Sequence, residues 1–247
     1  MNKAASAGRG NSCLDRLLAV AAPFQTYFDH PATTHEFCNR QGLKILANDG
    51  FGQYADFLQG YDKELNMGVN WADKGWKNIH HYFDPATQKG LWHFANAVSI
   101  FDVYHQLALQ FARRRRLRRA VFFIGAAAHL VQDACVPQHA RAKLFDGHKQ
   151  YEMWVQENFA GYAVATGGAY SAGQPAATLL MGNACVAADY FDWVRYEGDT
   201  SRFRQVTAEV LALAQRSTAG LLLTFAEEAF KAAGNLLKDS RMSRSVA

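Results

Sequence analysis

The chain contains few cysteines, and they are far apart. Its 247 residues include only four, and no Cys-x-x-Cys pair occurs. This spacing argues against a zinc site made of thiolates and against a dithiol redox motif. Cys135 stands two residues before Pro137, a position more typical of a small buried residue than of a ligand. Any metal site must therefore be sought among histidines and carboxylates.

Long apolar runs and strand-like patterns are also missing. No run of 18 apolar residues occurs, so we expect no transmembrane helix. Alternation of polar and apolar residues is almost absent, whereas apolar residues recur at helical spacing through most of the chain. Hydrophobic residues make up 49% and charged residues only 19%, which excludes a largely disordered chain. The sequence predicts an all-α fold, a single domain of many helices.

We expect three segments: an N-terminal segment at residues 1–24, a folded domain at 25–237 and a flexible tail at 238–247. The first contains a short apolar stretch that weakly resembles a signal peptide, so we expect a secreted or extracytoplasmic protein. The domain also contains an irregular stretch at 66–90 and a Gly/Ala/Ser-rich loop at 161–175. Its helices are expected at residues 34–48, 51–65, 91–113, 117–134, 148–159, 177–193 and 200–237.

The formal net charge of +4 is small, but positive charge is concentrated in one place. Residues 113–119 include six arginines. Such a run fits a solvated turn between two helices. It also fits attraction to anionic phosphate, whether of lipid or of nucleic acid. The sequence does not separate these two interpretations.

Five side chains of metal-ligand type fall within residues 129–152. His129 and Asp133 are four residues apart, as are His148 and Glu152, and His139 follows Pro137 between the pairs. On a helix this spacing places two side chains on one face, about 5–6 Å apart at Cβ. Imidazole nitrogen with carboxylate oxygen is a ligand mixture that zinc favours, whereas calcium and magnesium take nearly all oxygen. We interpret the group as a site for more than one metal ion.

These residues resemble the bacterial zinc-dependent phospholipases C, whose fold is shared with the S1/P1-type nucleases. The family signature is His-x-x-x-Asp, then Pro, then His two positions later, then His-x-x-x-Glu. The segment His81-Tyr-Phe-Asp-Pro is similar to another family segment, and Thr34-His35 is similar to its N-terminal histidine segment. The resemblance covers residues 35–230. It implies a multi-helix fold of the phospholipase C/P1 nuclease type.

The resemblance implies that zinc ions share seven side chains of this chain. Two ions are expected, and a third if the N-terminal site is complete. The family completes that third site with an N-terminal tryptophan, but no tryptophan precedes Trp71 here. The implied ligands are His81, His129 and Asp133 for the first ion, His139, His148 and Glu152 for the second, and His35 with Asp133 and the mature N-terminal residue for the third.

The resemblance also implies a catalytic carboxylate upstream of His81, acting near the metals as ligand or base. Asp73 is the better match, and Asp62 is the alternative. The aromatic residues Trp71, Trp76, Tyr82 and Phe83 could line a head-group pocket or belong to the core.

The implied activity is hydrolysis of phospholipids to diacylglycerol and a phosphorylated head group by metal-activated water. We expect a phospholipid partner, peripheral contact with a membrane surface and a monomer, with nucleic acid less favoured as a substrate. A single-strand nuclease of the S1/P1 type is the enzymatic alternative, although its second pair usually ends in Asp, so Glu152 favours the phospholipase. A metal-stabilised module with impaired catalysis is the non-enzymatic alternative.

Overall fold

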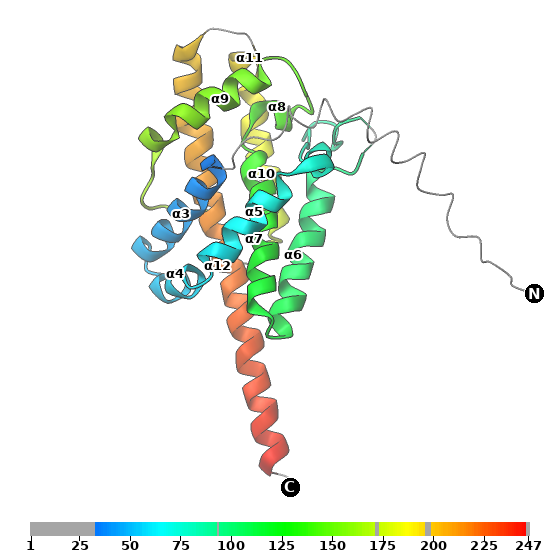
Figure 1. Ribbon diagram of the computed structural model, residues 1–247, viewed down its shortest axis with the longest axis vertical. Coiled ribbons are helices and arrows are strands. Elements are labelled where there is room, and N and C mark those ends of the chain that lie inside the picture. The colour runs from blue at the N-terminus through cyan, green and yellow to red at the C-terminus, as the bar shows by residue number, and fades with distance from the viewer. Residues whose placement is uncertain (1–32, 93, 171–172, 196–198, 246–247) are drawn as a thin grey trace, which may run out of the picture.

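The computed structural model describes residues 33–92, 94–170, 173–195 and 199–245, with side chains up to residue 232 (Figure 1). The expected N-terminal segment and the expected N-terminal zinc ligand lie outside the described residues. No strand is present in the described part of the chain, which confirms the all-α prediction; an isolated bridge joins Asp84 and Lys89. None of the described helices combines the length and apolar character that a membrane span requires.

The elements follow one another as α-helices with two short 3₁₀ helices, η1 and η2. Their bounds are α3 Thr33–Asn48, α4 Gly52–Gln59, α5 Asp62–Ala72, η1 Gly75–His80, α6 Ala97–Arg113, α7 Leu117–Asp133, α8 Pro137–Ala140, α9 His148–Asn158, η2 Phe159–Tyr162, α10 Ala177–Asp189, α11 Phe191–Val194 and α12 Thr200–Ser245.

Helix α7 is the centre of the bundle. It packs against α5, α6 and α12, and α12 packs in turn against α3 and α10 (Figure 1). Twelve residues of α7 are buried, including every residue from Ile124 to Asp133. The run Ala126-Ala-Ala128 gives the helix small side chains, so neighbouring helices approach it closely on several sides. The last turn of α7, which carries His129 and Asp133, is therefore held inside the protein.

Two expected boundaries are wrong, and both have local causes. The expected helix at 51–65 is two helices, because the chain breaks at Gly60 and Tyr61; α5 then restarts with two acidic residues in its first turn and continues to Ala72. The expected helix at 91–113 begins only at Ala97. Trp92 has a φ of +54°, which is incompatible with a helix, and the Asn96 side chain caps α6 by accepting a hydrogen bond from the Ser99 amide.

The other expected helices correspond to observed ones, with smaller differences at their ends. Tyr190 separates α10 from α11, and α12 continues past the expected end at residue 237 to Ser245. Helix α7 matches the expected range to within one residue, and α9 begins at His148 as expected.

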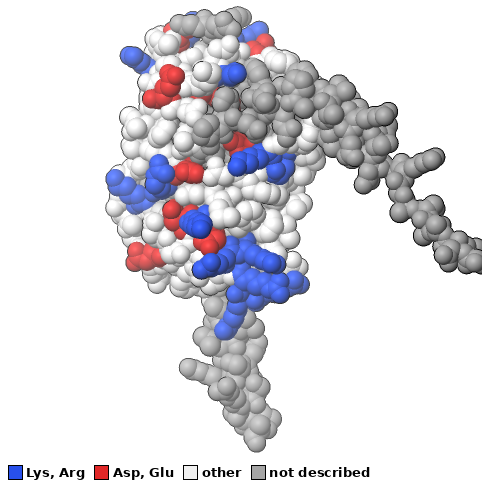
Figure 2. All heavy atoms as spheres, viewed as in Figure 1, with Lys and Arg blue, Asp and Glu red and all other residues white. Residues whose placement is uncertain are grey.

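The arginine run lies at the turn between α6 and α7, and all six arginine side chains are exposed. Figure 2 shows basic side chains gathered towards this lower end of the molecule. The turn is at the opposite end of α7 from Asp133. At about 1.5 Å per helical residue, the length of α7 places this turn roughly 24 Å from Asp133.

Glycines allow α5 and α7 to touch at backbone distance. A Cβ at Gly68 would lie 1.9 Å from the Phe122 carbonyl oxygen, and one at Gly125 would lie 2.1 Å from the Leu65 carbonyl oxygen. Neither backbone can yield without moving a whole helix. The contact fixes α5, and with it Asp73 just beyond the end of α5, against the helix that carries His129 and Asp133.

We predict that Gly125→Ala destabilises the protein by about 1–3 kcal/mol, the usual cost of overpacking, because the new methyl group separates two packed helices. Urea unfolding measures the change. Gly182→Ala is the matched control: Gly182 lies in α10 with nothing near its Cβ position, and the exchange should stabilise by about 0.5–1 kcal/mol. Equal unfolding free energies for the two variants would contradict the close-contact account.

Candidate metal centre

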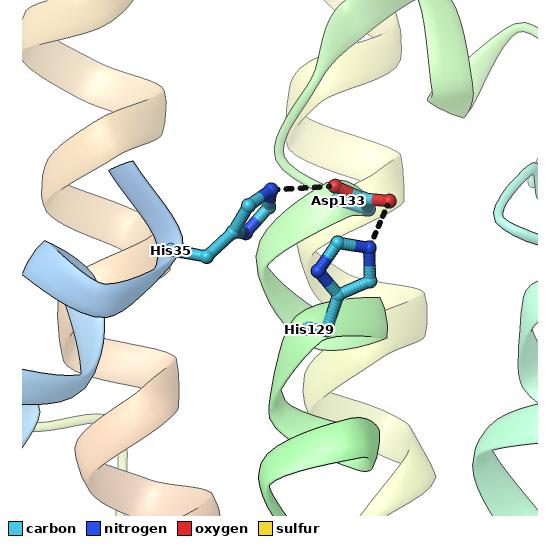
Figure 3. A group of neighbouring side chains, drawn as sticks. All are labelled: His35, His129 and Asp133. Carbon is cyan, nitrogen blue, oxygen red and sulfur yellow. Dashed lines mark ion pairs between the residues drawn. The ribbon is translucent and has the colours of Figure 1, made fainter. Parts of the chain in front are cut away.

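All seven predicted ligands come together at the end of the bundle where α7 terminates. Three form one group: His35 near the start of α3, and His129 and Asp133 in the last turn of α7. Figure 3 shows the two imidazoles directed at the carboxylate of Asp133 from two different helices. The i,i+4 pair therefore forms one face of a helix, as the spacing predicts, and α3 brings the third side chain to it.

Asp133 is the central side chain of the site. Its Oδ2 lies 2.7 Å from Nδ1 of His81, 3.1 Å from Nε2 of His129 and 3.4 Å from Nδ1 of His139. Its Oδ1 lies 3.4 Å from Nε2 of His35. One buried carboxylate thus faces four imidazoles that come from four different segments of the chain, which agrees with a bridging role.

His139, His148 and Glu152 form a second group. Nε2 of His148 lies 2.9 Å from Oε1 of Glu152, and Nε2 of His139 lies 3.5 Å from the same oxygen. Pro137 is the first residue of α8, where its fixed φ and missing N–H suit a helix start, and this short turn presents His139. This group contains the three side chains that the sequence assigns to the second ion.

A third group contains Asp73, His81 and His129. Asp73 caps the C-terminus of α5, and its Oδ1 lies 3.8 Å from Nε2 of His129. Asp62, at the other end of α5, is not among the residues that line the pocket; it accepts a hydrogen bond from Asn66 at 3.1 Å. The structure therefore places Asp73, and not Asp62, beside the histidines.

Burial sets the protonation of the imidazoles. It lowers the pKa of His81 and of His129, although Asp133 partly opposes the change. Burial, with the charge of His129, lowers the pKa of His35 to about 4. Neutral imidazoles, the form that binds metal, are therefore favoured at these three positions.

The acidic side chains keep their charge because neighbouring histidines outweigh the effect of burial on their pKa values. Burial alone would raise the pKa of Asp133, but His129 and His139 outweigh it and hold that pKa well below its usual range. Burial would likewise raise the pKa of Glu152, but His148 lowers it to about 2. Burial would lower the pKa of His148, and its neighbour Glu152 raises it instead.

The donor atoms fit divalent zinc. His148 Nδ1 lies 3.2 Å from the Leu144 carbonyl oxygen, which can only accept, so Nδ1 carries a proton. Nε2 of His148 donates to Glu152 at 2.9 Å, and a bound ion would take the place of that proton. Nδ1 of His129 and Nδ1 of His139 are buried without a hydrogen-bond partner. Unpaired buried nitrogens are costly, and a metal ion at His139 would pair one of them. Three groups of nitrogen and carboxylate ligands make a set that zinc prefers.

A pocket opens onto all three groups of ligands. His35, Asp73, His81, Asp133, His139, His148 and Glu152 all line it. Of the four aromatic residues considered for a head-group pocket, Tyr82 alone lines it; its ring lies 4.6 Å from that of His139. Trp71 is not among the lining residues and packs against Tyr104 and Phe122 instead.

Two residues of the site were not identified from the sequence. Gln132 is buried, lines the pocket and lies 2.9 Å from Nδ1 of His35. Asn78 is also buried and lines the pocket, and its Oδ1 has no hydrogen-bond partner. Neither belongs to the ligand pattern. The sequence did offer one sign of a role for Gln132: it is a polar residue within a largely apolar helix, directly before Asp133.

Comparisons with known proteins agree with this geometry. A family model described as zinc dependent phospholipase C matches residues 34–207. Phospholipases C of Clostridium perfringens and Paraclostridium bifermentans are each 26% identical, over 160 and 162 residues; each match covers 55% of this chain and 40% of the relative. The chain thus aligns with less than half the length of these curated relatives.

Two solved structures share the fold. They are the alpha-toxin of an avian strain of Clostridium perfringens and the alpha toxin of Clostridium absonum, both with a TM-score of 0.68. Their sequence identities are 21% and 17%, and each match covers 79% of this chain and 63% of the other. At these identities the likeness concerns the fold alone.

We predict that the zinc-free protein loses stability as the pH falls below about 6.5, the usual histidine value. The lowered pKa values of His35, His81 and His129 mean that the unfolded chain takes up protons that the folded chain does not. Each such proton contributes about 1.4 kcal/mol per pH unit. The raised pKa of His148 acts in the opposite sense, stabilising the fold at low pH, but it is one group against three.

Urea unfolding at pH 7.5 and 5.5, in the presence of a chelator, measures this slope. His35→Asn should make it shallower, and His80→Asn serves as the control because its ring contacts the Ala95 carbonyl outside the cluster. A zinc-free protein that is equally stable at both pH values would refute the prediction.

Proposed function

The chain belongs to the zinc-dependent phospholipase C family, and on this premise we propose that it hydrolyses phospholipids to diacylglycerol and a phosphorylated head group. The observation that carries the proposal is the assembly of seven side chains of ligand type with Asp73 in one cluster, where all except the fully buried His129 line one pocket. The family match provides the reaction class. The substrate is part of the proposal, because the curated relatives extend well beyond the aligned segment.

In the proposed site, the seven ligand side chains bind zinc and a separate residue accepts a proton. Zinc, when bound, lowers the pKa of water towards neutrality and neutralises negative charge on phosphate oxygens. His139, His148 and Glu152 hold one ion, His81 and His129 with Asp133 hold another, and His35 extends the site to a third. Asp133 sits between these positions and keeps the imidazoles directed at a common centre.

Asp73 is the proposed proton acceptor. What supports it is its place in the pocket, with Oδ1 at 3.8 Å from Nε2 of His129 and a partly exposed side chain that water can reach. A carboxylate beside the metal positions can orient the attacking water and take its proton. Asp62 lacks this position, so we propose no catalytic role for it.

We propose that the protein contacts a membrane through the end of the bundle that carries the ligands, and not through the arginine run. Tyr82 and Leu91 form a small apolar cluster with Leu144 next to the ligands. The residues that follow the two leucines, Trp92 and Phe145, are 61% and 60% exposed. Exposed aromatic side chains beside the pocket suit a lipid interface, whereas the arginines lie at the far end of α7. We further propose a monomer acting outside the cytoplasm.

The nuclease alternative is less well supported. Glu152 contacts both His148 and His139, in the position where nucleases usually carry Asp. The arginine run, which could have guided nucleic acid, is roughly 24 Å from Asp133 by helix length. The seven side chains of ligand type and the pocket beside them also favour an active enzyme over an impaired module.

We predict two or three zinc ions per chain in the zinc-loaded protein, measured by elemental analysis. Glu152→Gln should weaken the site of His139 and His148, because it replaces a charged ligand by an amide, and should lower the zinc content by one. Glu157→Gln is the matched control, since Glu157 is exposed on the same helix. A wild-type chain that holds one zinc or none after loading would refute the multinuclear site.

We predict that Asp73→Asn lowers kcat on phosphatidylcholine vesicles by about 10²–10⁴-fold, as expected for loss of a general base. Asp62→Asn should retain activity at saturating zinc, because Asp62 lies outside the pocket. Single-stranded DNA is assayed in parallel. Turnover of DNA without turnover of lipid would replace the phospholipase proposal by the nuclease, and equal losses in both variants would remove the assignment of Asp73.

A further inference from the structure

A chain of side-chain hydrogen bonds leads from Asp62 to the metal centre. Asn66 Nδ2 donates to Asp62 at 3.1 Å, and Asn39 Nδ2 donates to Asn66 Oδ1 at 2.9 Å. Gln132 Nε2 donates to Asn39 Oδ1 at 3.0 Å, and Gln132 Oε1 lies 2.9 Å from Nδ1 of His35. Three amides in series thus connect a carboxylate on α5 with a ligand histidine on α3.

The chemistry of its two ends fixes the direction of this chain. An ionised carboxylate only accepts, so Asn66 must turn its NH₂ towards Asp62 and its oxygen towards Asn39. Each following amide is then forced to donate towards Asp62 and to accept from the other side. At the end of the series, the oxygen of Gln132 faces His35, and Nδ1 of His35 must therefore carry the proton.

A second contact orients Gln132 independently. The Thr218 hydroxyl donates to the Ala214 carbonyl at 2.7 Å, so it accepts when Gln132 Nε2 approaches it at 3.0 Å. Both N–H groups of Gln132 are then used, by Asn39 and Thr218, and its oxygen is left for His35. Gln132 is 3% exposed and Asn39 is fully buried, so reversing either amide would leave buried groups unpaired.

From this geometry we propose that Gln132 is a positioning residue, and that the chain from Asp62 through it holds His35 in the tautomer with the proton on Nδ1. Nε2 then presents its lone pair beside Asp133, 3.4 Å from Oδ1. Asp62 acts as the fixed end of the chain. This explains why a carboxylate at Asp62 lies outside the pocket and yet is tied to it. The inference rests on the proposed zinc site for its consequence, but the tautomer itself does not depend on zinc.

The experiment uses the full chain labelled with ¹⁵N-histidine, zinc-loaded and after removal of zinc, with the His35 signals assigned by His35→Asn. In the wild type the proton should be on Nδ1 in both states. Gln132→Met, which keeps the length of the side chain but removes its polar atoms, should release the proton to Nε2 in the zinc-free chain. The affinity for one zinc ion should fall by about 10–100-fold, as for other residues that orient metal ligands.

Gln132→Glu is the conservative control. Its carboxylate still accepts from Nδ1, so the wild-type tautomer should be retained. Asp62→Asn alone should keep the wild-type tautomer, because Thr218 still orients Gln132. Asp62→Asn combined with Thr218→Val removes both orienting contacts and should introduce a second His35 tautomer. Valine keeps the shape of threonine, so this double variant reports on the chain even if Gln132→Met does not fold.

The outcomes separate this inference from the proposed function. An unchanged tautomer and unchanged zinc affinity in Gln132→Met would overturn it, as would an unchanged tautomer in the double variant of Asp62→Asn with Thr218→Val. Loss of the tautomer in both Gln132→Met and Gln132→Glu would attribute the effect to packing and would also overturn it. A wild type with the Nδ1 tautomer that binds zinc without hydrolysing lipid would leave the inference standing and refute the phospholipase.

Discussion

The buried carboxylate of Asp133 is the constraint on which the rest of the site depends. A charge at the end of a fully buried helix turn is costly unless it is paired, and here four histidines surround it. Those histidines come from α3, the residue after η1, α7 and α8, so their packing around one carboxylate also joins these segments. Burial lowers the pKa of His81 and of His129 and so favours their neutral form, while the histidines beside Asp133 lower its pKa and keep it ionised, which is the state that metal binding requires.

Close helix packing makes this arrangement possible. With Gly68 and Gly125 at their contact, α5 and α7 approach at backbone distance, and α5 delivers Asp73 to within 3.8 Å of His129. A wider crossing would carry the carboxylate away from the pocket. The glycines thus act on the chemistry from a distance, through the position of a helix and not through any contact with the ligands.

The parts of the site that the sequence could predict are those that depend on local geometry. The two i,i+4 pairs follow from helical periodicity, and His139 follows from Pro137 at a helix start. The resemblance to a family added His35 and His81, which are far away in the sequence. The choice between Asp73 and Asp62 could not be made, because both stand at the ends of the same helix and the difference lies in which end of α5 reaches His129 in the last turn of α7. Gln132 was missed because its role depends on Asn39 and Thr218, which are 93 and 86 residues away.

The two aspartates of α5 illustrate how position, and not residue type, determines a role. Asp73 faces an imidazole and the pocket, where a carboxylate can accept a proton from water. Asp62 faces an asparagine amide, and its only available chemistry is to accept that hydrogen bond and orient the amides beyond it. Because α5 packs closely against α7, one of these carboxylates lies beside His129 and the other is connected to His35 through three amides. Helix α5 thus carries one carboxylate beside the ligands and another that orients the amides. Because both depend on how α5 packs, the stability of the bundle and the geometry of the site are coupled.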